Sequence, residues 1–270
     1  MCAILSIIAT TFTKTKVVTS FHGLAFADSN QVFQKFIFKH SSALVFVSNH
    51  TFDTYKTKCP FLPLGKCHVV YNGVSFSRIQ VKNLGTANTG ELKLGMVGSF
   101  RISRNQLFVC GFLKKLLDEG VRFHFYFIGA RCKGEEKCYD DCVAFCRNNG
   151  LEDSVSFLGG CDNVPQLLSS LDAYIYATYS DTFGLSIIEA IASGLPTFVN
   201  DWPVAHEVTH DGAYAYIYKS EDVDDLFEKF SAYLNNKQRY AQSAIKNAHL
   251  VRQEFSIETH IDNLNKIYLA

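Results

Sequence analysis

The sequence has no apolar run long enough to span a bilayer, no internal repeats and no low-complexity tracts. Its opening apolar run, Met1–Ala9, is far too short to cross a membrane and lacks the basic flank and cleavage site of a secretory leader. Nothing in the composition marks the chain as disordered or fibrous. With 47% hydrophobic and 19% charged residues over 270 positions, we expect a globular cytoplasmic protein with one large core or two modest ones.

Cys-x-x-Cys pairs are also missing, although the chain has nine cysteines. Nine cysteines without a leader indicate a reducing compartment. Four of them, Cys132, Cys138, Cys142 and Cys146, lie close together, and the last three recur every fourth residue along a predicted helix. A metal or cluster site is the alternative, but this spacing is typical of a buried helical stripe, and we expect no metal.

The net charge is zero, but the charges are unevenly distributed. Residues 1–85 contain nine Lys or Arg and two Asp or Glu, a balance of +7 that the rest of the chain offsets. The excess of positive charge in residues 1–85 favours an anionic partner. A membrane face and a phosphorylated substrate would fit equally well.

From Leu92 onward, short apolar runs alternate with longer periodic stretches, which predicts βα units and a parallel sheet with helices on both faces. The predicted strands are residues 92–97, 123–129, 155–159, 173–178, 196–200 and 215–219. The predicted helices are residues 105–118, 135–149, 164–170, 184–193 and 223–234. These elements suit one complete Rossmann-like domain, which we place at residues 86–250.

The first 85 residues predict only part of a second Rossmann-like domain. Its predicted elements are a helix at 2–13, a strand at 16–21, a helix at 28–41, and strands at 43–48 and 68–71. Because this pattern begins in the middle of a sheet, we expect the first half of the domain to be absent.

Three further features define the borders of these regions. Asp28 and Gln31 have the spacing of a capping box, which places the start of the second helix. The polar stretch Lys82–Gly90 is the predicted linker. Residues 237–270 predict one or two helices, and we expect 251–270 to pack back on the first region.

Two turns follow predicted strands, at the strand ends where helix N-termini attract phosphate in α/β proteins. The first contains Gly98, Ser99, Arg101 and Arg104. Glycine allows a close backbone approach, and two arginines can bind a diphosphate bidentately. Taken alone, such a turn is equally typical of a solvated connection.

The second turn, Tyr179–Ser186, has Asp181 just before the helix and Glu189 about a turn and a half inside it. Carboxylates accept hydrogen bonds from sugar hydroxyls, so a diphosphate at the helix start would leave one acid for a ribose and one for a transferred sugar. The alternative is that Asp181 is an ordinary acid at a helix N-terminus and Glu189 an exposed helix residue.

The stretch SDTFGLSIIEAIASGLP, residues 180–196, resembles the acid-x7-Glu motif of the family-4 glycosyltransferases, which are retaining enzymes with the two-domain GT-B fold. VGSFRISRNQ at 97–106 resembles their phosphate-binding turn, and YNGV at 71–74 resembles the end of their first domain. VVTSFHG at 17–23 resembles a first-domain strand that ends in an active-site histidine. The resemblance implies an α/β, GT-B-like chain with a complete C-terminal domain and a partial N-terminal one.

The resemblance also implies roles for individual residues. Glu189 would hold the ribose hydroxyls, and Asp181 would hold the donor sugar and its phosphate together with backbone N–H groups of the turn. Arg104 stands where the family usually has a lysine on the diphosphate, and His22 would lie near the reacting face of the sugar. The implied catalytic residues are His22, Asp181 and Glu189. The implied donor-binding residues are Gly98, Ser99, Arg101, Arg104, Thr182, Phe183, Gly184, Leu185, Ser186 and Glu189.

The sequence departs from the family pattern at three points. Asp181 replaces a more usual glutamate. Ser99 stands where an arginine often follows the glycine, which removes one diphosphate contact unless Arg101 substitutes for it. The chain begins about a hundred residues short of a full two-domain enzyme, so the glycine-rich loop and most of the acceptor site are expected to be missing.

The implied activity is transfer of a sugar from a UDP- or GDP-linked donor to a glycan or lipid-linked acceptor, with retention, in bacterial surface polysaccharide synthesis. No cofactor, metal or nucleic-acid partner is expected. Aromatic and basic residues of the helix at 28–41 favour docking to an anionic inner membrane face, although an ordinary helix with its aromatics in the core is the alternative. These residues are Phe33, Lys35, Phe36 and Lys39.

Two other functions fit the same residues. The chain can be a nucleotide-sugar-binding subunit or truncated remnant that needs a partner chain to complete its first domain. It can also be a GT-B enzyme of different chemistry, such as a nucleotide-sugar epimerase or a phosphorylase. The sequence offers no pyridoxal-phosphate lysine context, which argues against a phosphorylase.

Overall fold

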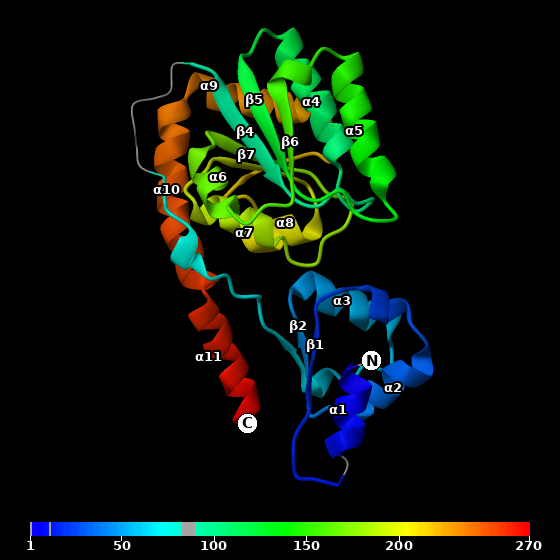
Figure 1. Cartoon of the computed structure of the whole chain (residues 1–270). Helices are drawn as coiled ribbons and strands as arrows, with labels where there is room; N and C mark the ends of the chain where they lie inside the picture. Colours follow the sequence, from blue (N-terminus) through cyan, green and yellow to red (C-terminus); the bar gives the residue numbers. More distant parts are fainter. Residues whose placement is uncertain (1, 11, 83–89) are drawn as a thin grey trace. The chain divides into compact units, whose positions relative to one another are not determined.

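The computed structural model describes residues 2–10, 12–82 and 90–270 and shows two compact α/β units (Figure 1). The first unit combines Met1–Gly73 with Phe255–Ala270, and the second is Val74–Glu254. The boundaries in the structure follow residues 73 and 254, whereas the sequence analysis placed them after 85 and 250. Residues 83–89 of the predicted linker lie outside the described residues.

The second unit is built on a six-stranded parallel sheet of order β6-β5-β4-β7-β8-β9. Its strands are β4 (Leu92–Val97), β5 (Phe123–Ile128), β6 (Val155–Gly159), β7 (Ala173–Tyr176), β8 (Thr197–Asn200) and β9 (Tyr216–Tyr218). All six predicted strands are confirmed, with ends that differ by at most two residues. Every residue of β7 and β8 is buried, as expected for central parallel strands covered on both faces.

Helices cover both faces of this sheet (Figure 1). One layer contains α4 (Gln106–Asp118), α5 (Glu136–Asn148) and α9 (Val223–Asn235). The other contains α6 (Val164–Ser170), α7 (Leu185–Ala192), α8 (Pro203–Thr209) and α10 (Lys237–Glu254). This arrangement is the predicted doubly wound domain. The sequence analysis did not predict α8, a short helix that begins at a proline.

The predicted cysteine stripe is part of the packing between α4 and α5. Cys142 and Cys146 are buried, whereas Cys138 is only half-buried. The Sγ atom of Cys146 lies 3.9 Å from that of Cys110 on α4. The described residues contain no group of His, Cys, Asp and Glu side chains that could hold a metal ion.

The first unit contains a three-stranded parallel sheet of order β1-β2-β3. Its strands are β1 (Val18–Phe21), β2 (Ala43–Phe46) and β3 (Cys67–Val69). Its helices are α1 (Cys2–Thr10), α2 (Gln31–His40), α3 (Asn49–Lys58) and α11 (Ile257–Tyr268). Aromatic rings fill the core, where Phe21 stacks on Phe46 with ring centroids 5.0 Å apart. The sequence analysis missed α3, whose N-cap Ser48 accepts a hydrogen bond from the Thr51 N–H.

The predicted capping box at Asp28 is wrong. Helix α2 begins three residues later, and Asn30 caps it by accepting a 2.8 Å hydrogen bond from the Val32 N–H. Asp28 instead ends a short 3-10 turn, Ala25–Asp28, and forms an ion pair with Lys58 at 2.6 Å. Asn30, rather than Asp28, therefore supplies the N-cap of α2.

The C-terminal helix α11 belongs to the first unit and packs beside the segment that follows β3. His260 Nδ1 lies 2.6 Å from the carbonyl oxygen of Tyr71. The backbone approaches closely at Gly73, where an added Cβ would lie 2.7 Å from Ile257 Cα and from His260 Cβ. A side chain at residue 73 would therefore separate α11 from this segment.

No helix within residues 2–10, 12–82 and 90–270 is long and apolar enough to span a bilayer. On α2, Phe33 is exposed and Phe36 is half-buried against the core, while Lys35 and Lys39 are exposed.

Candidate functional site

Strands β4 and β7 lie next to each other in the sheet of the second unit, and the direction of chain winding reverses between them. Loops at the carboxyl ends of such a strand pair separate and leave a crevice for ligands. Both sequence-predicted turns follow these two strands, so the fold brings the two turns to one edge of the sheet.

The first turn continues from β4 through Gly98 and Ser99 and packs closely against the chain after β5. An added Cβ on Gly129 would lie 2.0 Å from the Gly98 carbonyl oxygen, so only glycine fits at position 129. On the other side, Gln106 Nε2 donates to the Gly98 and Ser99 carbonyl oxygens at 3.3 and 3.1 Å. The backbone of the turn is therefore held from two sides.

Arg104 crosses from the first turn to the second. Its Nη1 donates to Asp181 Oδ2 at 2.7 Å, to Thr178 Oγ1 at 3.3 Å and to the Tyr176 hydroxyl. Burial acts against the charged guanidinium, but the neighbouring Tyr176 and Asp181 outweigh it and raise the pKa of Arg104. Arg104 is thus a charged group that already has an anionic partner.

Asp181 is held by both of its carboxylate oxygens. Oδ2 accepts from Arg104 and from the Tyr176 hydroxyl, and Oδ1 accepts from the backbone N–H groups of Thr182 and Phe183 at 2.7 and 3.4 Å. Burial alone would raise the pKa of Asp181, but Arg104 and these donors lower it. The carboxylate is therefore ionised and fixed in position.

Helix α7 (Leu185–Ala192) begins within the second turn, and Gly184 is its N-cap. This residue has φ of 76°, a left-handed conformation that favours glycine. Among the described residues, the N–H groups of Gly184 and Leu185 form no backbone hydrogen bond. Both lie at the positive end of the helix dipole, where an anion is stabilised.

Glu189 is on α7, partly buried, and makes no ion pair or side-chain hydrogen bond within the part of the chain that the structure describes. Burial raises its pKa above the ordinary value for glutamate. Unlike Asp181, its carboxyl group keeps its acceptor capacity for a ligand.

The other predicted site residues are found in different surroundings. Arg101 is exposed, and its side chain forms no ion pair among the described residues. Leu185 is 44% exposed at the start of α7, and the Ser186 hydroxyl is buried. His22 is exposed and follows β1, so it belongs to the first unit, whereas all other predicted site residues belong to the second.

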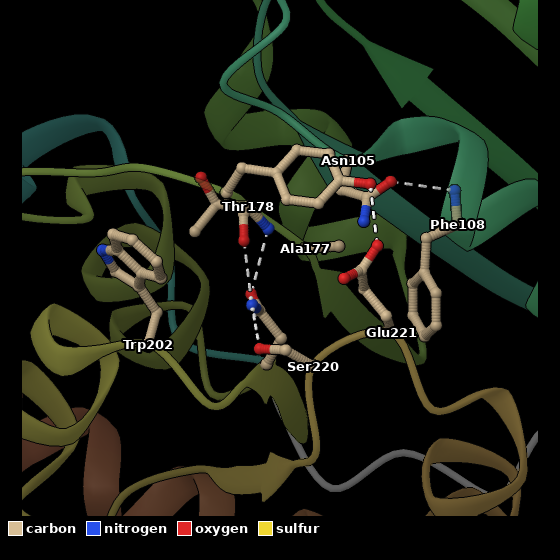
Figure 2. Close-up of a pocket in the computed structure, with 9 residues that line it drawn as sticks. Asn105, Phe108, Ala177, Thr178, Trp202, Ser220 and Glu221 are labelled. Atoms are coloured by element: carbon tan, nitrogen blue, oxygen red, sulfur yellow. Dashed lines mark hydrogen bonds between the residues drawn. The ribbon is translucent and has the colours of Figure 1, made fainter.

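A pocket of about 150 Å³ lies beside the second turn, between the start of α4 and the chain at the ends of β7, β8 and β9 (Figure 2). Trp202 lies at one side of it, and Phe108 and Glu221 lie at the other (Figure 2). The Asn200 side chain connects two sides of the pocket through hydrogen bonds of 2.9 Å each. It accepts from the Thr178 N–H and donates to the Thr178 carbonyl oxygen and the Ser220 hydroxyl. The lining residues are Asn105, Phe108, Ala177, Thr178, Tyr179, Asn200, Trp202, Ser220 and Glu221. None of these lining residues was a predicted site residue.

Sequence reasoning missed three residues that contact the site directly. Tyr176 and Thr178 bind Arg104, and Trp202 Nε1 donates to the Asp181 carbonyl oxygen at 3.3 Å. The available signal was the alternation of tyrosines in the strand sequence AYIY, which places polar groups where a buried strand normally has aliphatic side chains.

Comparison with known proteins gives a family match over more than half of the chain. The family model described as "Glycosyl transferases group 1" matches residues 78–251. The lipopolysaccharide core biosynthesis mannosyltransferase LpsB of Rhizobium meliloti is 24% identical over 121 residues, which are 44% of this chain and 34% of that protein. The O-antigen chain mannosyltransferase RfbU of Salmonella typhimurium is 40% identical over 65 residues, 23% of this chain and 18% of that protein. The matched regions thus span about a third or less of these relatives.

Solved structures match almost the whole chain. HepE of Anabaena, in complex with UDP and glucose, superposes with a TM-score of 0.84 at 18% identity, covering 98% of this chain and 74% of that one. Sucrose-phosphate synthase from Thermosynechococcus elongatus gives a TM-score of 0.81 at 15% identity, covering 98% of this chain and 70% of that one. These likenesses confirm the predicted GT-B-type α/β fold.

Proposed function

Since this chain belongs to the glycosyl transferases group 1 family, we propose that it transfers a sugar from a UDP- or GDP-linked donor to a glycan or lipid-linked acceptor. We further propose that configuration is retained and that the product is a bacterial surface polysaccharide. The observation that carries this proposal is the meeting of the two turns at the ends of β4 and β7. The complex of HepE with UDP and glucose supports a nucleotide-linked donor.

The donor diphosphate is proposed to lie between the first turn and the start of α7. The N–H groups of Gly184 and Leu185 and the helix dipole supply one set of contacts. Arg101, which has no anionic partner among the described residues, supplies the second and takes the place of the arginine that Ser99 replaces. Arg104 is proposed to contact the diphosphate while it remains paired with Asp181. It would therefore hold the two turns together as well as bind the phosphate.

Glu189 is proposed to accept hydrogen bonds from the two ribose hydroxyls. The Glu189 carboxyl group is partly removed from water, which raises its pKa, and it has no hydrogen-bond partner among the described residues. Binding of a ribose would supply the missing donors and keep the carboxylate ionised.

Asp181 is proposed to act at the transferred sugar, and His22, in the first unit, keeps the role that the family resemblance implies for it. In the proposed step, the bond between the anomeric carbon and the diphosphate oxygen breaks, and a bond to the acceptor oxygen forms on the same face. The leaving phosphate takes the acceptor proton, so no metal or cofactor is required. Helix α7 and the arginines stabilise the charge that develops on the leaving group.

Glu189→Ala is the direct test of this proposal. Transfer from UDP- and GDP-sugars is measured for the wild type, for Glu189→Ala and for Glu228→Ala, a control that removes an exposed glutamate from α9. We expect Glu189→Ala to reduce transfer by about 100-fold and the control to leave it unchanged. Transfer that is equal in all three proteins contradicts the assignment.

A nucleotide-sugar-binding subunit that needs a partner chain is the second candidate. This function would need only the proposed donor-binding residues, which all belong to the second unit. Donor binding without transfer by this chain alone, together with transfer after co-expression of a completing chain, would support this function over the first.

The proposed location is the cytoplasm, at the inner face of the cell membrane. Phe33 is 53% exposed on α2, near the exposed Lys35 and Lys39, which suits an anionic bilayer surface. Co-sedimentation with liposomes that changes with neither salt nor anionic lipid content would contradict this location.

A further inference from the structure

Strand β7 carries two tyrosines, Tyr174 and Tyr176, that are both fully buried. Residues two apart in a strand share one face of the sheet, so both rings extend from the same side of β7. The Tyr174 hydroxyl bonds the backbone of Val97 at the end of β4, at 3.1 Å from its nitrogen and 3.3 Å from its oxygen. The Tyr176 hydroxyl bonds Arg104 and Asp181 instead.

A buried phenol hydroxyl is costly unless it has hydrogen-bond partners, and phenylalanine would fill the same space without this cost. Arg104 can only donate, so the Tyr176 oxygen accepts from the guanidinium. Its single proton is then donated to Asp181 Oδ2. The hydroxyl therefore joins the cation of the first turn to the anion of the second.

We propose that Tyr176 is a positioning residue that fixes the Asp181 carboxylate and the Arg104 guanidinium in the donor site. This inference rests on the proposed function for its consequence in catalysis. The claim that Tyr176 holds Asp181 and Arg104 in place rests only on contacts within the second unit. Burial raises the pKa of Tyr176 well above its ordinary value, so the hydroxyl keeps its proton across the working pH range.

The chain contains a matched pair of variants for this test. Tyr176→Phe and Tyr174→Phe each remove one fully buried hydroxyl from the same strand, but only Tyr176→Phe removes a donor to Asp181. The titration of the Asp181 carboxyl group is followed by carbon-13 NMR in the full chain, with Asp181→Asn used to assign its signal.

We expect the pKa of Asp181 to rise by about one pH unit in Tyr176→Phe and to stay unchanged in Tyr174→Phe. Equal titration curves in the wild type and both variants would overturn the inference. In a transfer assay, Tyr176→Phe is expected to lower kcat/KM on the order of tenfold at pH 7. If the wild type transfers no sugar, the proposed function fails, while the titration still decides whether Tyr176 positions Asp181.

A double-mutant cycle supplies a second readout from stability. Urea unfolding is measured for Tyr176→Phe, Asp181→Ala and the double variant. We expect the effects to be non-additive, because each single change already removes the contact between the two side chains. Additive effects would overturn the inference even if the titration of one variant were lost through poor folding.

Discussion

Asp181 and Glu189 are two carboxyl groups near one helix start whose surroundings move their pKa values in opposite directions. Asp181 is surrounded by donors, which lower its pKa despite burial, and Glu189 has burial alone, which raises it. Such separation is common where two acids have different roles. It also gives the two residues opposite effects on stability.

The ionised form of Asp181 stabilises the folded protein. Because its folded-state pKa is lower than its unfolded value, this contribution is present above about pH 4 and is lost as the pH falls through the lowered pKa. Asp181→Asn is expected to reduce the free energy of unfolding at pH 7 by roughly 1–3 kcal/mol, and by less at pH 3. Urea unfolding at both pH values measures this, with Asp153→Asn at an exposed position as the control. A loss that is the same at pH 3 and pH 7 would contradict the expected pairing.

Glu189 is expected to behave in the opposite way. Its folded-state pKa is raised, so its stabilising contribution is present below the unfolded pKa and is lost as the pH rises through the folded pKa. Glu189→Gln should therefore increase the free energy of unfolding at pH 7 and leave it nearly unchanged at pH 3. Thermal unfolding of the two proteins at these pH values tests the sign, and a destabilised variant at pH 7 would be inconsistent with an unpaired carboxylate.

At the scale of elements, the start of α7 depends on the left-handed conformation of Gly184. A Cβ at this position would also lie 3.0 Å from Ile187 Cδ1. Gly184→Ala is expected to cost about 1–2 kcal/mol. Gly111→Ala is the matched control, because Gly111 lies inside α4 with its nearest neighbour 3.9 Å away, and it should stabilise the protein by about 0.5–1 kcal/mol. Denaturant midpoints that move in the same direction for both variants would refute this reading of the helix start.

The first turn depends in the same way on Gly129. Gly129→Ala must displace the backbone of Gly98 and Ser99, which should weaken donor binding on the order of tenfold or more. Gly160→Ala, where an added Cβ would meet only Ala130 Cβ at 3.6 Å, is the control and should bind the donor normally. Titration calorimetry with the nucleotide sugar compares the two, and normal binding by Gly129→Ala would exclude the first turn from the donor site.

At the scale of the whole molecule, the elements that sequence predicted well are those with strong periodic signals. Strands β4 to β9 are short, mostly apolar runs rich in branched and aromatic residues, and the doubly wound order follows from their alternation with helices. Helices α3 and α8 were missed because their sequences, NHTFDTYKTK and PVAHEVT, have no clear apolar stripe. The predicted capping box was wrong because Asn30 caps α2, while Asp28 pairs with a lysine thirty residues away, a contact that local spacing cannot reveal.

The candidate site shows the same limit. The two turns were predicted from glycines, arginines and acids at strand ends, but the pairing of Arg104 with Asp181 joins residues 77 positions apart. Tyr176 and Trp202 were not predicted because their hydroxyl and indole groups meet the second turn only in the folded sheet. A motif therefore predicted the candidate site, whereas the partners of each charged group became visible only in the structure.

The most direct test of the central claim is a titration of the wild-type chain with UDP- and GDP-sugars, followed by thermal unfolding, alongside Glu189→Ala. At a ligand concentration a hundred times Kd, binding stabilises the folded state by about 2.7 kcal/mol. We predict a clear rise in Tm of the wild type with one class of donor and little or none for Glu189→Ala. An unchanged Tm of the wild type with every donor, or an equal rise in both proteins, would contradict a nucleotide-sugar site built on the two turns and Glu189.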